Sequence, residues 1–110
     1  MPEVFEVYKD AREEHRFRLK APNGEIIASG EGYSTKAACL NGINSIKENC
    51  VIPERFETYQ DNIGEWRFRL KAANGQIIAT GEGYSSEDGL ANGIKSVTKY
   101  ALSAEIKEVE

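Results

Sequence analysis

The chain repeats itself: a unit of about fifty residues occurs twice, and the second copy follows the first at an offset of 51 residues. Aligning residues 5–47 with residues 56–98 needs no gap, and 25 of the 43 positions are identical. Two such units are too few for a solenoid, and one alone is marginal as a folding unit. We therefore expect a single pseudo-twofold domain over residues 1–110, divided into repeat 1 (residues 4–51) and repeat 2 (residues 55–109).

Each repeat opens with three strand signals. Residues 5–8 and 16–20 alternate apolar and polar side chains, which is the period of a half-buried strand, and the segment IIAS at 26–29 follows as a third strand. Between the second and third strands lies Asn23-Gly24. This pair predicts a type I′ hairpin turn, in which both central residues have positive φ. Repeat 2 carries the same signals.

A helix follows the third strand in each repeat. Its apolar positions have the spacing i, i+4, i+7, i+11, which predicts one buried stripe facing a sheet. Ser34 and Ser85 precede these segments and suit the N-cap position. Gly42 and Gly93 lie beside the stripes, where they favour a close approach between helix and sheet. The stripe residues are Cys39, Ile43, Ile46 and Cys50 in repeat 1, and Leu90, Ile94, Val97 and Ala101 in repeat 2.

These signals predict an α+β fold of two tandem β-β-β-α-β repeats. We expect one antiparallel sheet with both helices on one face. A last strand at residues 104–109 would pair back with the first half of the chain. After the first helix the sequence VIP at 51–53 runs straight into repeat 2, so the pairing of residues 51–54 is open.

The two cysteines are expected to be reduced thiols packed as small hydrophobes. They are eleven residues apart and the chain has one histidine, so no ligand set for a metal is present and no cofactor is expected.

The strand alternation also predicts a charged sheet face directed away from the helices. Counting both repeats, this face holds six basic and two acidic residues, a formal charge of +4 on a chain whose net charge is −4. One interpretation is a solvated face held by cross-strand pairs. The other is a platform for anions or single-stranded nucleic acid, where arginines meet phosphates and tyrosines stack on bases. The candidate binding residues are Tyr8, Arg16, Arg18, Lys20, Tyr59, Arg67, Arg69 and Lys71.

Catalysis finds little support in the sequence, and we expect a protein that is not an enzyme. The segment GEGYS precedes each helix, but its spacing matches no phosphate-binding loop, and Glu31 or Glu82 would repel a phosphate. His15 is replaced by Trp66 in repeat 2, so the repeats share no histidine base. Only a cleft in which Glu31 faced Glu82 would supply a carboxylate pair.

The segments RFRLKA, NG, IIA, GEGYS and NGI together resemble the YegP-like family of small bacterial and archaeal proteins in its tandem-duplicated form. The resemblance covers residues 5–109. It implies β-β-β-α-β units joined in one antiparallel sheet, with C-terminal strands exchanged between the units. Single-unit members pair as homodimers, so the resemblance implies a monomer here. The family implies no catalytic residue.

The sequence therefore favours a non-enzymatic binding or accessory module, with nucleic-acid or anion binding as the alternative. The partner would be a protein or a single-stranded nucleic acid. The first ten residues carry no apolar signal segment, and no apolar run approaches the ~18 residues that cross a bilayer, so we expect a cytoplasmic protein without a membrane partner.

Overall fold

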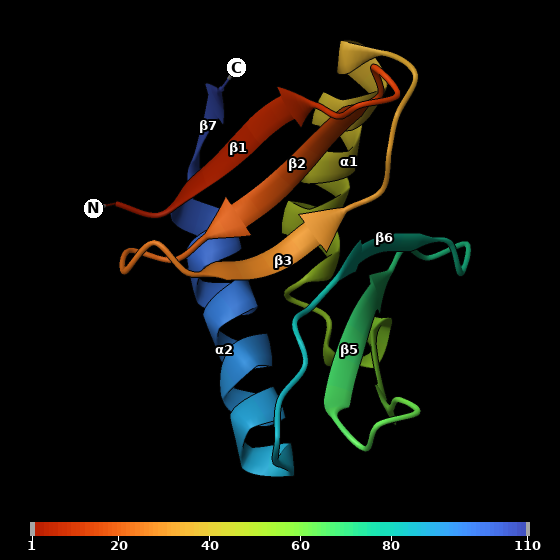
Figure 1. Cartoon of the computed structure of the whole chain (residues 1–110), viewed down its shortest axis with the longest axis vertical. Helices are drawn as coiled ribbons and strands as arrows, with labels where there is room; N and C mark the ends of the chain where they lie inside the picture. The colour runs from red at the N-terminus through yellow and green to blue at the C-terminus, as the bar shows by residue number, and fades with distance from the viewer. Residues whose placement is uncertain (1, 110) are drawn as a thin grey trace.

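The computed structural model describes residues 2–109, which form two helices and a seven-stranded sheet (Figure 1). The elements in chain order are β1 (Val4–Lys9), β2 (His15–Lys20), β3 (Ile26–Gly30), α1 (Lys36–Asn49), the short 3-10 helix η1 (Pro53–Arg55), β4 (Phe56–Gln60), β5 (Trp66–Lys71), β6 (Ile77–Thr80), α2 (Glu87–Ser103) and β7 (Glu105–Glu108).

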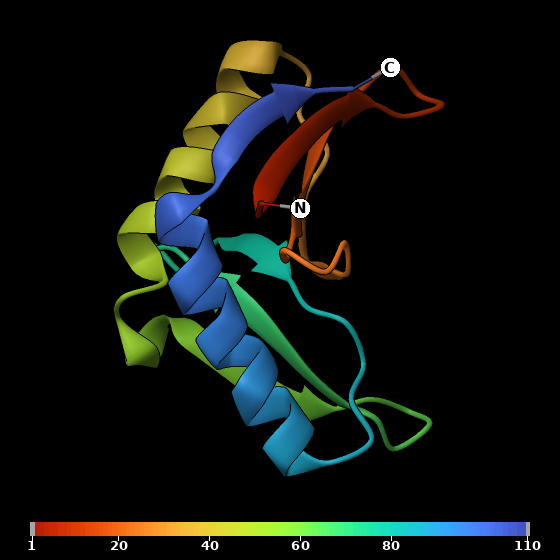
Figure 2. The ribbon, with the colours of Figure 1, turned by 90° about the vertical axis from the view of Figure 1, so that its left-hand side faces the viewer.

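The strand order in the sheet is β4-β5-β6-β3-β2-β1-β7, and the two repeats meet where β3 pairs with β6. Both helices lie on the same side of the sheet (Figure 2). The expectation of an all-antiparallel sheet is wrong, because β7 runs parallel to β1. Residue alternation carries no information about strand direction. That direction depends on the end of the sheet at which α2 delivers the chain.

The core lies between the sheet and the helices. Two alternate residues in each of β1, β2 and β5 are buried, as the alternation predicts, and the helical stripes cover them. Both cysteines are buried and free, and burial raises the pKa of each thiol. Ile94 departs from the prediction because it is only partly buried. The largest fully buried side chains come from both repeats and include Phe5, Phe17, Phe68, Leu19, Leu70, Ile43, Ile46 and Val97.

The helix starts and the hairpin turns differ in detail from the predictions. The N-caps are Thr35 and Ser86, one residue later than expected, and their hydroxyls accept hydrogen bonds from the amides of Ala38 and Gly89. In the hairpin after β2 only the glycine of Asn23-Gly24 has positive φ, at 87°. This is a three-residue loop with a bulge, not a type I′ turn, because Ala21 and Glu25 close it. A separate register shift between β2 and β3 lies between Leu19 and Lys20.

Repeat 1 ends differently from repeat 2. After α1, residues 50–51 form a turn and η1 follows, so this segment contributes no strand and leads directly into β4. The expected fourth strand of repeat 1 is therefore absent from residues 51–55. Pro53 begins η1, where its fixed φ and missing N–H are tolerated. In a strand the same residue would remove a hydrogen bond of the sheet. The first strand of repeat 1, β1, is therefore paired on both sides, by β2 and β7, whereas its counterpart β4 is an edge strand that pairs only with β5 among residues 2–109.

Candidate functional site

The structure gathers the eight predicted binding residues into two clusters of four. Tyr8, Arg16, Arg18 and Lys20 lie on β1 and β2, and we call them the β1–β2 cluster. Tyr59, Arg67, Arg69 and Lys71 lie on β4 and β5, and form the β4–β5 cluster. In the sheet order β6 and β3 stand between the two hairpins. The predicted face is thus two small clusters toward opposite edges of the sheet.

Each cluster is built around one arginine on one tyrosine. The guanidinium carbon of Arg18 lies 4.5 Å from the centre of the Tyr8 ring, and its Nε donates to Glu6 at 2.7 Å. The Lys20 ammonium lies 3.2 Å from the same carboxylate. Hydrogen bonding and charge from these two cations hold the pKa of Glu6 below its ordinary value. The carboxylate is therefore ionised at neutral pH, and it neutralises part of the cluster.

The outermost arginine of each cluster belongs to the hairpin turn. Arg67 Nε donates to the Asp61 carboxylate at 2.7 Å, and Asp61 also accepts from the amides of Ile63 and Glu65. The bond from Arg67 is the main reason that the pKa of Asp61 is lowered. Arg16 and Asp10 repeat the arrangement in repeat 1. These two arginines therefore hold their hairpin turns.

Every cation of the two clusters has a carboxylate within 4 Å. The sequence count missed the loop residues, because strand alternation stops where the turns begin. Six cations face six carboxylates, so the clusters are formally neutral and do not carry the predicted +4. A phosphate would have to displace a carboxylate, and nucleic-acid binding on these clusters stays a prediction. The six partners are Glu6, Asp10, Glu14, Glu57, Asp61 and Glu65.

Glu31 and Glu82 lie in different grooves. Each groove is formed where the GEGY segment of one repeat faces the Asn-Gly turn of the other. Glu82 lines a groove of about 450 Å³ with Glu25 and Tyr84, whereas Glu31 lines one of about 530 Å³ with Gln76. The two glutamates do not share one groove. Their placement therefore does not support the carboxylate pair that general acid–base catalysis would need.

The edge strand β4 presents an uncovered side. It pairs with β5, and no strand of residues 2–109 pairs with its other side. Thr58 pairs with Phe68 in the same way that Val7 pairs with Phe17 in repeat 1, so Thr58 and Val7 are equivalent positions. The carbonyl of Val7 faces β7, because it accepts a hydrogen bond from the amide of Val109 at 2.9 Å. Since the N–H and C=O of one residue in an antiparallel pair point the same way, the peptide groups of Thr58 face the open side.

Two equivalent glutamates differ in side-chain exposure because β1 is covered by β7 and β4 is open. Glu6 on β1 lies opposite Lys107 of β7, and its side chain is 14% exposed. Glu57 on β4 has no such neighbour, and its side chain is 46% exposed. Sequence reasoning missed this edge. Its one signal is the polar Thr58 at the position where repeat 1 has the buried Val7.

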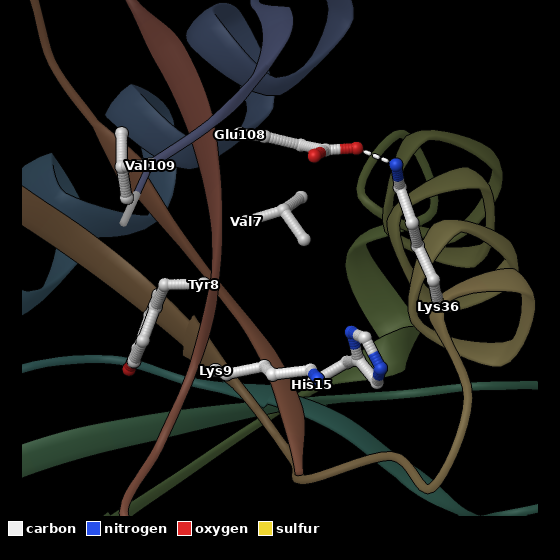
Figure 3. Close-up of a pocket in the computed structure, with 7 residues that line it drawn as sticks. All are labelled: Val7, Tyr8, Lys9, His15, Lys36, Glu108 and Val109. Carbon is white, nitrogen blue, oxygen red and sulfur yellow. Dashed lines mark ion pairs between the residues drawn. The ribbon is translucent and has the colours of Figure 1, made fainter. Parts of the chain in front are cut away.

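A second feature lies where repeat 1 meets the last strand of the chain. A cavity of about 330 Å³, which we call the Lys36 pocket, lies where β1 and β7 approach the first turn of α1 (Figure 3). Val7 and Val109 provide apolar walls, while Lys36 forms an ion pair with Glu108. The other lining residues are Tyr8, Lys9 and His15. No group of three or more His, Cys, Asp or Glu residues that could hold a metal ion occurs within residues 2–109. Neither helix in that range combines the length and apolar character needed to cross a membrane.

Comparison with known proteins places these features in context. Residues 10–57 and 61–108 each match the family described as "Domain of unknown function (DUF1508)", and the two matches are again 51 residues apart. The chain is 42% identical to the UPF0339 protein in the ptx operon 5′ region of Stutzerimonas stutzeri, covering 99% of this chain and 98% of that protein. It is also 42% identical to the UPF0339 protein YegP of Yersinia pestis, covering 96% and 94%.

Two solved structures have the same fold. The structure of YegP from E. coli, described as a protein of unknown function, matches with a TM-score of 0.92 at 37% identity, covering 98% of this chain and 93% of that one. The structure of the UPF0339 protein SO3888 from Shewanella oneidensis matches with a TM-score of 0.91 at 39% identity, covering 98% and 92%. The tandem arrangement and the tertiary fold are therefore shared with both.

Proposed function

We propose a function from the geometry of the sheet. The chain belongs to the DUF1508 family of YegP-like UPF0339 proteins, and the description of that family names no function. In this proposal the protein is a non-enzymatic monomer that binds an extended segment of a protein partner along β4. The segment would add one strand to the sheet, and main-chain hydrogen bonds would supply much of the affinity. The observation that carries the proposal is that β4 is open where the equivalent strand β1 is covered by β7.

The repeat symmetry indicates what the partner segment looks like. On β1 the covering strand runs parallel and places Lys107 opposite Glu6. A strand seated in the same way on β4 would run parallel and place a basic residue opposite Glu57. We therefore propose an extended segment with a lysine or arginine at that position and apolar residues at alternate positions, which share one face of the strand. In this view β7 is a strand exchanged between the repeats, and the partner takes the place of the reciprocal strand.

The repeat also supplies the probe: a capped synthetic peptide, Ser-Ala-Glu-Ile-Lys-Glu-Val, which is the sequence of residues 103–109. Titrated into ¹⁵N-labelled protein, it should cause saturable amide shifts on β4. Thr58→Pro should weaken binding at least ten-fold, because proline removes an N–H that faces the open edge and leaves the bonds to β5 in place. Thr58→Val, which copies repeat 1, is the matched control and should bind at least as tightly. A peptide with glutamate in place of its lysine should bind more weakly.

Three outcomes would argue against the proposal. Equal binding by Thr58→Pro, or shifts confined to β1, would mean that the peptide does not use the open edge. Concentration-dependent dimerisation without peptide, lost in Thr58→Pro and measured by light scattering, would mean that a second copy of the chain covers β4.

A further inference from the structure

We infer that the Lys36 pocket binds a small organic carboxylate, a role separate from strand binding at β4. The first support is that the repeats differ in charge at this place. The positions of Lys9, His15 and Lys36 in repeat 1 are occupied by Gln60, Trp66 and Glu87 in repeat 2. Three basic residues thus line one pocket in repeat 1, and their counterparts in repeat 2 include none.

These three residues come from three different elements and meet at one cavity. Lys9 ends β1 and pairs in register with His15, which begins β2, while Lys36 begins α1. In Figure 3 His15 lies below Val7, and the Lys36–Glu108 pair lies above it. In repeat 2 the larger Trp66 side chain stands at the His15 position and packs against the core. Replacing tryptophan by histidine at this position leaves room for a ligand beside a nitrogen donor.

The pocket already holds a carboxylate from the chain itself. Glu108 of β7 pairs with the Lys36 ammonium, and the two side chains are 60% and 49% exposed. An ion pair this exposed contributes little to the stability of the fold. A free carboxylate can therefore take the place of Glu108 on Lys36 at small cost to the fold.

The remaining walls define the rest of the ligand. Val7 and Val109 line the cavity beside the basic groups. The Tyr8 ring points away from His15 and Lys36 (Figure 3). The volume of about 330 Å³ is at the lower end of the range for small-molecule sites, roughly 300–1,000 Å³. A compact acid with one carboxylate and an apolar body satisfies both sets of walls. An inorganic anion would satisfy the basic groups alone.

The test uses sodium benzoate as the probe and sodium phosphate as the comparison anion, at matched ionic strength. Benzoate should shift the amide signals of Val7 and Val109 with saturation in the millimolar range. The chain has one histidine, so its ring gives one unambiguous ¹H–¹³C signal that should move in parallel. Lys36→Gln should weaken binding at least five-fold, whereas Glu108→Gln should tighten it about three-fold by removing the competing carboxylate.

Swapping residues between the repeats provides the control. His15→Trp should abolish the shifts at Val7 and Val109, because the repeat 2 residue fills the cavity. Trp66→His should create no second site, because the neighbouring positions are Gln60 and Glu87. Shifts that rise linearly with benzoate, an unchanged affinity in Lys36→Gln, or phosphate binding as tight as benzoate binding would each overturn the assignment.

Discussion

Glu13 and Gly64 occupy the same position in the two copies of one hairpin turn. Each donates its amide to the carbonyl of the turn aspartate, Asp10 or Asp61, and each has positive φ, 62° for Glu13 and 85° for Gly64. Glycine, which has no Cβ, adopts this region without penalty, whereas an L-residue there costs roughly 1–2 kcal/mol. Repeat 1 therefore carries backbone strain that repeat 2 avoids with glycine.

Exchanging these two residues tests that difference. Glu13→Gly should raise the free energy of unfolding by about 1 kcal/mol, since removal of strain outweighs the greater freedom of the unfolded chain. Gly64→Glu should lower it by about 1 kcal/mol, and no atom lies near enough to its Cβ to add a clash. Urea denaturation measures both. Equal and opposite changes are expected, and a destabilised Glu13→Gly would contradict the assignment.

At the scale of the elements, the segments GEGYS and NGI are linked by a contact between each helix and the loop before it. A Cβ built on Gly42 would overlap the Tyr33 hydroxyl, and one built on Gly93 would overlap that of Tyr84. Both tyrosine rings are partly buried against the core. The close approach expected of these helix glycines is therefore to a tyrosine ring, and it explains why the two segments recur together.

A double-mutant cycle checks this contact. Gly42→Ala should lower the free energy of unfolding by about 1–2 kcal/mol, because crowding against Tyr33 outweighs the better helix propensity of alanine. In a Tyr33→Ala background the same change should become stabilising by up to about 1 kcal/mol. Chemical denaturation of the four proteins gives the coupling. A cost for Gly42→Ala that is the same in both backgrounds would show that Tyr33 is not the cause.

At the scale of the whole molecule, each helix packs on strands of both repeats. α1 contacts β2 of its own repeat and also β5 and β6 of the other, while α2 contacts β5 and β3. β7 then joins the end of repeat 2 to the first strand of the chain. Neither repeat buries its own core alone, so the two repeats are expected to unfold in one cooperative transition.

Cutting the chain between the repeats tests this interdependence. Separate fragments of residues 1–53 and 54–110 should each lack a cooperative thermal transition and dispersed amide signals, because each exposes apolar surface that the other covers. An equimolar mixture should recover the spectrum of the intact protein. Circular dichroism and ¹⁵N spectra report both states. A fragment that folds alone would contradict the shared core.

Identical and differing positions of the two repeats carry different information about the molecule. Identities at the offset of 51 lead to the fold, since they include the buried strand residues, the turn residues and the tyrosine–glycine contacts. Differences lead to the candidate sites. Thr58 in place of Val7 accompanies the open edge of β4, and His15 in place of Trp66 accompanies the Lys36 pocket. Sequence reasoning weighted the identities and so placed the binding face where the charges prove to be paired.

The sequence alone determined the two repeats, the strands, both helices and nearly all of the core, because period-two and helical spacings are local properties of the chain. Only the tertiary structure decided that β7 runs parallel to β1, that repeat 1 lacks a fourth strand, and that turn carboxylates such as Asp10 and Asp61 neutralise the arginines. Each of these depends on which end of an element delivers the chain and on which side chains meet across the fold. Residue spacing carries neither piece of information.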